Sequence, residues 1–587
     1  MTKYTNGKPQ SVMLSEICKI IGGTSYGITD REISKIAHIK RHIEEGCLFF
    51  AFQTWRVDTY SNIFTAIEKK AAAIVTDKYI DDYPCIVVKD SHQAFMDLSE
   101  WYRNNMNADI IAITGSIGKT STKEMVASVL QNSFNIEKNQ ENSNSSDLAA
   151  MNIMDLKNTT EKLVQEVAMQ DIHSTSMAIH PTICIITNIG YSHVESFGSR
   201  ENIFKEKIKI LDGMQPQDIA IINIDDDMLA TFAPNTIQKV ITYALENNNA
   251  DVTAENIVKC QNGYSFDVNY YGKTYPVKTN CPGKHNVLNA LASFIVGKLY
   301  GMTASDIATG IANFQPTGYR QNIFEKDGIT VYADCFNAAP DSVKGALDTL
   351  EEMDIVPGGK RIAILGDMLE LGTFSQELHE IVGAHLNKKN LDTVILYGEE
   401  VTYTHACITN PYLKVKYVLK REDLIDVLKK ECMSPNNILL FKGSHGMELE
   451  GVIDELFGTK FSHSFFENTY VLGRLKREKC DLTGYFREKK HKTAAIYGIS
   501  VDEGELISTL TDAGVNVKYA IDRKAKYLPK HLYKIPVYSL DDTLEEVDMV
   551  FISLRTYSDE LVAKINSKLK ADILSYKKLV SELLTKE

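Results

Sequence analysis

The 587-residue sequence lacks several features that mark special classes of protein. No stretch approaches the roughly 20 consecutive apolar residues that a membrane-spanning helix needs, and the first residues lack the apolar core of a signal peptide. Internal repeats and low-complexity tracts are missing. The net charge of −13 argues against a nucleic-acid-binding surface. We therefore expect a globular protein with no membrane span and no nucleic-acid partner.

The ten cysteines are scattered along the chain, and no two of them form a Cys-x-x-Cys pair. This spacing argues against a zinc site or a disulfide framework and is typical of reduced thiols, so we expect a cytoplasmic protein. The content of 44% hydrophobic and 24% charged residues is ordinary for a globular protein. The length predicts about three or four domains.

Short apolar runs alternate with helical patterns, which predicts α/β domains with parallel, doubly wound sheets. The predicted strands are 47–52, 71–76, 85–88, 110–113, 162–167, 182–188, 219–224, 329–333, 361–365, 393–397, 437–441, 493–497, 515–521 and 549–553. We predict an N-terminal substrate-binding domain over 1–106, a central P-loop domain over 107–315, a third domain over 316–459, a linker over 460–489 and an additional α/β domain over 490–587.

The most informative segment is Gly-Ser-Ile-Gly-Lys-Thr, which directly follows the apolar run Ile110 to Ile113 and Thr114. A buried strand, a glycine-rich turn and a Lys-Thr pair that opens a helix predict a phosphate-binding loop. Lys119 can reach the terminal phosphates of a nucleoside triphosphate, and the Thr120 hydroxyl can ligate Mg²⁺. The alternative is a chance Gly-Lys-Thr sequence in a βα turn. The predicted nucleotide-binding residues of this loop are Gly115, Ser116, Gly118, Lys119, Thr120 and Ser121.

Two further side chains follow buried strands. Glu166 ends the apolar segment that begins at Lys162, and His193 follows the strand that ends at Asn188. Ligands of open α/β sheets gather at the carboxyl ends of the strands, so we expect Thr120, Glu166 and His193 to converge. Taken singly, each could instead be a solvated or hydrogen-bonded surface side chain.

Five segments resemble the Mur ligases of peptidoglycan synthesis, and they occur in that family's order. They are 197–207, 283–290, 334–342, 366–372 and 442–447. The P-loop, with two rather than four residues between its first glycine and its Gly-Lys pair, also has that family's form. The resemblance spans about residues 30 to 458. It implies a three-domain Mur ligase architecture with a Rossmann-like third domain.

The resemblance also implies a reaction: ATP-dependent amide formation through an acyl phosphate. An amino acid or dipeptide, D-alanyl-D-alanine by closest likeness, would be joined to a carboxylated acceptor, a UDP-muramoyl-peptide by the same likeness. Phosphorylation supplies the carboxylate with a leaving group, and Lys119 together with metal ions would neutralise the transferred phosphoryl group. Two Mg²⁺ ions are implied, one held by Thr120 and Glu166 and a second held with the help of His193.

Lys207 matches the family's lysine that CO₂ converts to a carbamate, which acts as a carboxylate-like metal ligand. Alternatively, it is one of three lysines, with Lys205 and Lys209, on a solvated helix face. A catalytic set of Lys119, Lys207 and His193 is therefore implied.

Five residues correspond to family positions that bind the nucleotide. Asn286 and Asn289 match residues that contact adenine, because an amide can donate and accept at a base edge. Arg320 and Asp334 match residues that clamp the phosphates and ribose, and Asn337 lies in the same loop as Asp334.

Several positions depart from the family's pattern. Residues 36–41 and 55–59 replace its uridine-diphosphate-binding elements, Leu148 and Ala150 stand where Gly and Pro are usual, and His445 replaces an arginine. Two alternatives stay open: a paralogue that uses a different carboxylated acceptor, and a nucleotide-binding regulatory protein without turnover.

The segment after residue 490 has no counterpart in the standard ligase. Gly498 to Gly504 follows a strand and faintly resembles a dinucleotide-binding turn, with Asp522 at the end of the next strand. A docking or regulatory module that binds a protein partner is the favoured interpretation over a working dinucleotide site.

Overall fold

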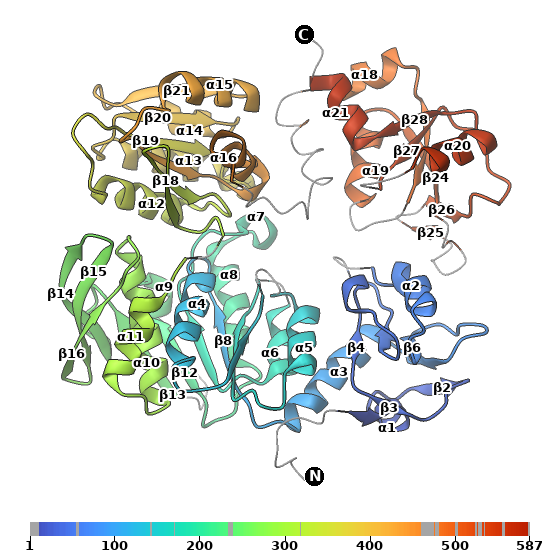
Figure 1. Cartoon of the computed structure of the whole chain (residues 1–587), viewed down its shortest axis with the longest axis horizontal. Helices are drawn as coiled ribbons and strands as arrows, with labels where there is room; N and C mark the ends of the chain where they lie inside the picture. The colour runs from blue at the N-terminus through green and yellow to red at the C-terminus, as the bar shows by residue number, and fades with distance from the viewer. Residues whose placement is uncertain are drawn as a thin grey trace. The chain divides into compact units, whose positions relative to one another are not determined.

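The computed structural model describes residues 11–54, 58–140, 144–169, 171–232, 239–316, 318–459, 475, 480–498, 503–522, 525, 531–532, 535–554 and 558–584. These residues form α/β parts, each around its own sheet (Figure 1). No helix among them has the length and apolar character to cross a membrane. None of the ten cysteines, all of which are described, forms a disulfide.

The N-terminal part has a five-stranded sheet in the order β2-β7-β6-β5-β4, in which only β2 is antiparallel to its neighbour. The short strands β1 and β3 pair separately. Its strands are β1 (Val12–Met13), β2 (Thr24–Tyr26), β3 (Glu32–Ile33), β4 (Ile36–Ala37), β5 (Leu48–Phe50), β6 (Ala73–Thr76) and β7 (Cys85–Val87), and its helices are α1 (Leu14–Ile20), α2 (Ile63–Glu68) and α3 (Ser91–Asn104). The three strands predicted here are confirmed.

The central part has a nine-stranded sheet in the order β16-β15-β14-β13-β12-β11-β8-β10-β9. Its strands are β8 (Asp109–Thr114), β9 (Ile136–Lys138), β10 (Lys162–Glu166), β11 (Ile183–Ile186), β12 (Ile219–Asn223), β13 (Lys239–Ala244), β14 (Val252–Cys260), β15 (Gly263–Tyr270) and β16 (Lys273–Lys278). The strands from β8 to β14 pair in parallel, which confirms the parallel arrangement for the four predicted strands β8, β10, β11 and β12. Strands β9, β13 and β14 are not among the predicted strands.

The remaining strands of this sheet differ from the prediction, because β14, β15 and β16 pair antiparallel. Their two connections are each only two residues long, which permits a hairpin but not a parallel crossover. Tyr271 and Gly272 in the second connection both have positive φ, the conformation of the turn that suits the twist of a hairpin.

The helices of the central part form two groups. α4 (Lys119–Leu130), α10 (His285–Leu299) and α11 (Ala304–Asn313) pack together, and α5 (Ser146–Asp155), α6 (Ile172–Ile179) and α8 (Arg200–Ile208) form a second group. The short helices α7 (Val194–Phe197) and α9 (Asp227–Ala230) follow strands β11 and β12.

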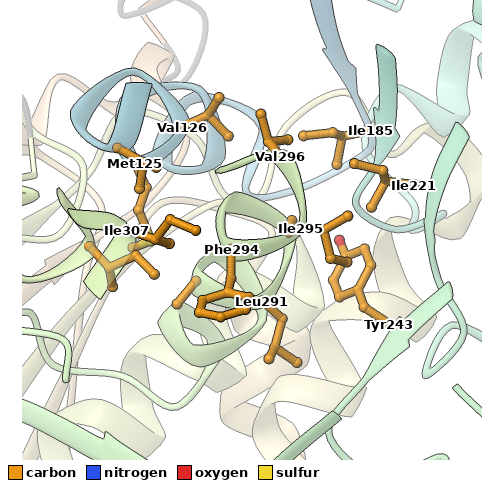
Figure 2. Close-up of a cluster of buried hydrophobic side chains, with 14 of the residues drawn as sticks. Met125, Val126, Ile185, Ile221, Tyr243, Leu291, Phe294, Ile295, Val296 and Ile307 are labelled. Carbon is orange, nitrogen blue, oxygen red and sulfur yellow. The ribbon is translucent and has the colours of Figure 1, made fainter. Parts of the chain in front are cut away.

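The core beneath α4 fixes the helix that follows the P-loop. Figure 2 shows Met125 and Val126 of α4 among side chains of α10, α11 and the sheet, including Phe294 and Ile221. A Cβ atom on Gly310 of α11 would lie 2.5 Å from the Cα atom of Val129, so only glycine permits this close approach of the two helices. Helix α4 is therefore packed closely against α10, α11 and the sheet.

The third part has a six-stranded sheet in the order β17-β18-β22-β19-β20-β21, parallel except for β17. Its strands are β17 (Asn322–Lys326), β18 (Ile329–Asp334), β19 (Arg361–Gly366), β20 (Thr393–Tyr397), β21 (Lys414–Val418) and β22 (Ile438–Lys442), and its helices are α12 (Pro340–Glu352), α13 (Ser375–Leu386), α14 (Val401–Ala406), α15 (Arg421–Glu431) and α16 (Leu449–Phe457). The four predicted strands are confirmed, and the unpredicted β17 and β21 are edge strands without buried apolar runs.

The C-terminal part has the strand order β25-β26-β24-β23-β27-β28, and all pairs except β25–β26 are parallel. Its strands are β23 (Thr493–Tyr497), β24 (Asn516–Ile521), β25 (His531–Leu532), β26 (Ile535–Tyr538), β27 (Met549–Ile552) and β28 (Asp572–Ser575), and its helices are α18 (Leu482–Glu488), α19 (Glu503–Asp512), α20 (Asp559–Lys568) and α21 (Tyr576–Leu584). The three predicted strands are confirmed.

Two findings bear on the predictions for the C-terminal part. Helix α18 lies inside the predicted linker, and its Phe486 packs into the core of the C-terminal sheet. A Cβ atom on Gly498 would lie 2.5 Å from the side chain of Leu554, so packing accounts for this glycine. Residues 499–502 of the dinucleotide-like turn lie outside the described residues. The domain boundaries themselves stay predictions.

Candidate active site

The loop between β8 and α4 has the backbone of a phosphate cradle. Gly115 has φ +147°, and a Cβ atom there would lie 1.9 Å from the Thr187 hydroxyl, so the chain passes where only glycine fits. Gly118, the N-cap of α4, has φ +81° and offers no side chain to cap the helix. The backbone N–H groups of the first turn, which includes Thr120 and Ser121, are therefore placed to bind an anion.

Side chains at the end of β11 hold this loop in place. The Asn188 Oδ1 atom accepts from the backbone N–H groups of Ser116 at 3.1 Å and Ile117 at 2.9 Å, and the Thr187 hydroxyl donates to the Ile117 carbonyl at 2.6 Å. The Ser116 hydroxyl accepts from the backbone N–H of Gly190 at 2.7 Å. Sequence reasoning missed Asn188 as a functional residue, although its position after the strand beside β8 could have indicated it.

Two lysines converge on one carbonyl oxygen of the loop. Lys119 Nζ and Lys207 Nζ each donate to the Gly115 carbonyl at 2.8 Å. Burial lowers the pKa of Lys119, and burial together with the neighbouring Lys119 charge lowers the pKa of Lys207 well below its usual value. Lys207 is only 1% exposed, whereas Lys205 and Lys209 are exposed, so the alternative of a solvated Lys207 is wrong.

Thr120 and Glu166 meet as predicted. The Thr120 hydroxyl donates to Glu166 Oε2 at 2.6 Å, and Glu166 is buried at the carboxyl end of β10. Asn144 donates to the other carboxylate oxygen at 3.1 Å, and Asn139 Oδ1 accepts from the backbone N–H of Glu166 at 2.8 Å. The carboxylate therefore has a fixed orientation toward the P-loop helix.

This oxygen pair fits Mg²⁺, which takes one or two protein oxygens and completes its coordination with phosphates and waters. Among the described residues, no cluster of three His, Cys, Asp or Glu side chains could hold a metal ion by itself. Such a cluster is not required where the nucleotide supplies further oxygens. The residues present thus fit a magnesium–nucleotide complex better than a free metal ion.

His193 does not join this pair. It lies after β11 with φ +64°, and its Nδ1 atom is hydrogen-bonded to the Glu370 carboxylate of the third part. No hydrogen bond links His193 to Thr120 or Glu166 within the described part of the chain. The expected convergence of the three side chains is therefore seen for two of them, and a metal-binding role for His193 stays a prediction.

The two asparagines of α10 are occupied by contacts within the chain. Asn289 Oδ1 accepts from the Thr122 hydroxyl at 3.0 Å, and Asn289 Nδ2 donates to Asn286 Oδ1 at 2.9 Å. Asn286 Nδ2 donates to the Pro282 carbonyl at 2.7 Å and to Gln321 Oε1 at 3.1 Å. Asn286 is fully buried. Its predicted contact with adenine would require exchange of these partners.

The third part supplies an arginine and a buried ion pair. Arg320 Nη1 donates to the Thr120 hydroxyl at 2.7 Å. Asp334, at the end of β18, pairs with Lys442 at 2.8 Å, and Lys442 also donates to the Asn337 carbonyl at 2.8 Å. Lys442 is 3% exposed and lies opposite Asp334 in the register of β18 and β22. The sequence places Lys442 in one of the five family segments but does not indicate this partner.

A phosphate cradle, a hydroxyl–carboxylate pair and an arginine from a second α/β part define a nucleotide-dependent P-loop enzyme. Two family models match this chain: the Mur ligase middle domain over residues 113–297, and the Mur ligase glutamate ligase domain over residues 319–445. The chain belongs to the Mur ligase family, whose members are ATP-dependent ligases that form C–N bonds.

Three relatives illustrate the similarity. The UDP-N-acetylmuramoyl-tripeptide–D-alanyl-D-alanine ligase of Bacillus subtilis (strain 168) is 30% identical over 440 residues, which are 73% of this chain and 94% of the relative. The MurF crystal structure from Acinetobacter baumannii is 26% identical, with a TM-score of 0.69. The match covers 76% of this chain and 99% of the MurF chain. The MurF ligase of Thermotoga maritima in complex with ADP is 25% identical, with a TM-score of 0.64, over 73% of this chain and 97% of its own.

The comparisons confirm the expected family, the Mur ligase fold and an ATP-dependent ligase activity. ATP and Mg²⁺ follow from this family membership, and the Thermotoga maritima relative was solved in complex with ADP. The cradle backbone of Gly115 and Gly118 and the family match favour a phosphate-binding loop over a chance Gly-Lys-Thr sequence.

Proposed function

We propose that this protein joins D-alanyl-D-alanine to the terminal carboxylate of a UDP-N-acetylmuramoyl-tripeptide, with cleavage of ATP to ADP and phosphate. The observation that carries the proposal is the buried Thr120–Glu166 pair beside Lys119 and Arg320, in a chain that aligns with almost the whole length of a ligase of this specificity. A regulatory protein without catalytic turnover would not require these four side chains to lie together.

In the first chemical step, the negatively charged acceptor carboxylate approaches the negatively charged triphosphate of ATP. An oxygen of the acceptor carboxylate attacks the γ-phosphorus, the bond to the β-phosphate oxygen breaks, and ADP leaves. Lys119 contacts the Gly115 carbonyl and Arg320 contacts the Thr120 hydroxyl of the same loop, so both can supply positive charge to the transferred phosphoryl group. Thr120 and Glu166 would hold Mg²⁺, which supplies further positive charge to the phosphate oxygens.

The second step forms the amide. The amine of the incoming dipeptide attacks the acyl carbon, and inorganic phosphate leaves with one of the original carboxylate oxygens. Water must be kept from the acyl phosphate until the amine arrives, which is a general reason for closure of such sites. The contact of Arg320 with Thr120 links the third part to the P-loop and supports a role for the third part in this closure.

Carbamylation of Lys207 is part of the proposal. A neutral amine adds to CO₂, and burial lowers the pKa of Lys207, which raises the fraction of neutral amine. Its Nζ atom is linked to the Gly115 carbonyl, and no carboxylate forms an ion pair with it among the described residues. The carbamate would place a negative charge beside the Lys119 ammonium group, and the two groups would attract each other. A second Mg²⁺, bound with the help of His193, belongs to the same hypothesis.

A different carboxylated acceptor is the second candidate, and the first domain favours testing it. His38, in the segment that replaces a uridine-diphosphate-binding element, is fully buried and stacks on Phe52 at 5.8 Å. It is therefore part of the local core and not a surface contact for a ligand. Residues 55–57 of the other replaced element lie outside the described residues.

The test measures ADP formation from Mg²⁺ and ATP with UDP-N-acetylmuramoyl-tripeptide, with and without D-alanyl-D-alanine, and identifies the product by mass. We expect ADP formation that needs both substrates, together with the mass of the pentapeptide product. The Lys119→Ala variant should be inactive, and the exposed Lys205→Ala variant serves as its matched control. Nucleotide binding without product would contradict the acceptor assignment and favour the second candidate.

Two expectations about the whole protein stay predictions. The cytoplasmic location agrees with ten cysteines that form no disulfide, and the C-terminal part is proposed to bind a protein partner. The latter can be tested by comparing the masses of complexes recovered with the full chain and with a chain that ends at residue 459.

A further inference from the structure

Arg320 reaches the nucleotide site across an aromatic side chain of its own domain. Its guanidinium carbon lies 3.9 Å from the centroid of the Phe336 ring, while Nη1 donates to the Thr120 hydroxyl. An arginine side chain has many rotamers, so without such a contact the guanidinium would sample many positions. The ring therefore limits where the guanidinium can lie.

The Phe336 ring is itself held by a second ring. Its centroid lies 5.2 Å from that of the His445 imidazole, and the planes differ by only 18°. His445 Nδ1 lies 2.5 Å from Glu450 Oε1, close enough for an ion pair when the imidazole is protonated. Glu450 is buried near the start of α16, which anchors the imidazole. The stack of Arg320, Phe336 and His445 is therefore connected to the core of the third part.

The topology of the sheet explains why these three side chains meet. Phe336 and His445 follow the carboxyl ends of β18 and β22, which are adjacent parallel strands. Arg320 precedes β17, whose first residue pairs with Ala333 near the end of β18. Three neighbouring strands thus deliver one residue each to the same edge of the sheet.

We propose that Phe336 and His445 are positioning residues, which hold the Arg320 guanidinium at the nucleotide site. This inference rests on the proposed function in one respect, namely that Arg320 binds the phosphates of the nucleotide. Neither aromatic residue touches substrate in this scheme. His445 acts on Phe336, Phe336 acts on Arg320, and Arg320 contacts the nucleotide.

The size of the effect follows from the contacts. A cation–π contact of a partly exposed arginine corresponds to roughly two- to thirtyfold in a binding constant. Loss of a charge-assisted hydrogen bond corresponds to roughly ten- to a hundredfold. We expect Arg320→Ala to weaken binding of Mg²⁺–ADP to the full-length protein by the larger factor, and Phe336→Leu by the smaller one.

A double-mutant cycle tests whether Phe336 acts through Arg320. The dissociation constant of Mg²⁺–ADP is measured by calorimetry for the full-length protein, both single variants and the double variant. If the proposal is correct, Phe336→Leu weakens binding in the parent but has no further effect in the Arg320→Ala background. Additive effects would overturn the proposal, because Phe336 would then act independently of the arginine. Unchanged binding by Arg320→Ala would also overturn it.

The control for general damage is Phe324→Leu. Phe324 is a half-buried aromatic residue of the same domain that packs edge-on against Phe457. The same change of side chain there should leave Mg²⁺–ADP binding unchanged. An equal loss in this control would assign the Phe336 effect to weakened packing of the domain and would overturn the proposal.

Two substitutions of His445 separate stacking from charge. His445→Phe keeps a ring beside Phe336 without the contact to Glu450, whereas His445→Gln removes the ring. We expect His445→Phe to bind Mg²⁺–ADP within about threefold of the parent protein and His445→Gln to bind as weakly as Phe336→Leu. Equal losses in both variants would overturn a positioning role through stacking. Because ADP binding needs no acceptor, failure of the proposed acceptor would leave this test and its interpretation intact.

Discussion

The substitution Lys207→Met separates the chemistry of Lys207 from its burial. Methionine has a similar length and no charge, so the side chain still fills its place on α8 next to the P-loop. It cannot form a carbamate. We expect kcat for ADP formation to fall by about 10²- to 10³-fold, the usual loss when one group that stabilises developing charge is removed. The exposed Lys205→Met variant on the same helix is the control.

The same substitution should stabilise the fold in a pH-dependent way. The pKa of Lys207 in the folded protein is lowered well below 10.5, mainly by burial and next by Lys119. Between that lowered pKa and 10.5, the unfolded chain binds more protons, so the stability of the parent protein rises with pH in this window by up to about 1.4 kcal/mol per pH unit. Methionine removes this term. Lys207→Met should therefore be more stable than the parent at pH 7, and its advantage should shrink toward pH 9.

Urea melts in CO₂-free buffer, followed by tryptophan fluorescence, measure the difference in unfolding free energy at pH 7, 8 and 9. A constant difference across this range, or a variant less stable at every pH, would refute the reasoning about a neutral buried amine.

A second experiment tests the carbamate directly. Removal of CO₂ should lower the activity of the parent protein, and small carboxylates should partly restore the Lys207→Ala variant. Full activity of Lys207→Ala without added carboxylate would contradict the role of this residue.

Three further predictions follow from the site and the core. Glu166→Gln should lower kcat about 10²-fold and raise the Mg²⁺ concentration needed for half-maximal activity, because the amide carries no charge; an unchanged Mg²⁺ titration would contradict this. Asp334→Asn should lower the unfolding free energy in urea melts by about 3–5 kcal/mol, because it leaves buried Lys442 without a carboxylate, and an unchanged midpoint would contradict it. A chain that ends at residue 489 should aggregate in sedimentation measurements, because Phe486 loses the core that buries it, whereas a chain that ends at residue 459 should stay monodisperse; equal behaviour of both would contradict this.

The strands that the sequence predicts correctly are those with continuous buried apolar runs. β8, β11, β20 and β23 are of this kind, because a central parallel strand is covered on both faces and its pattern needs no partner to be recognised. Edge strands such as β17 and β21 carry exposed or half-buried side chains, and their pairing decides their structure. The alternation of strands and helices elsewhere in the chain predicts parallel sheets and therefore does not predict the hairpins β14 to β16.

The site residues also fall into two groups: those that a local sequence places, and those that only the strand order places. The P-loop is a local sequence, and Glu166 ends a strand beside it, so both could be placed from the sequence. The links of Asn188 to the loop, of Lys442 to Asp334 and of Phe336 to His445 depend on which strands are neighbours, which the sequence does not state. Only the strand order brings these residues together.

The orientation of the His193 side chain could not be predicted from the sequence. Its position after β11 indicated a residue at the ligand-binding edge, and it does lie in that loop. Its backbone has positive φ, however, and its imidazole contacts Glu370 from a distant part of the chain. The direction of a side chain in an irregular loop depends on such long-range contacts.

The measurement that tests the central claim most directly follows an oxygen atom. The acceptor is labelled with ¹⁸O in its terminal carboxylate and is incubated with the full-length protein, Mg²⁺, ATP and D-alanyl-D-alanine, and the inorganic phosphate is analysed by mass. Ligation through an acyl phosphate at this site predicts one ¹⁸O atom in each phosphate released with product. Unlabelled phosphate formed together with labelled amide product would contradict the account.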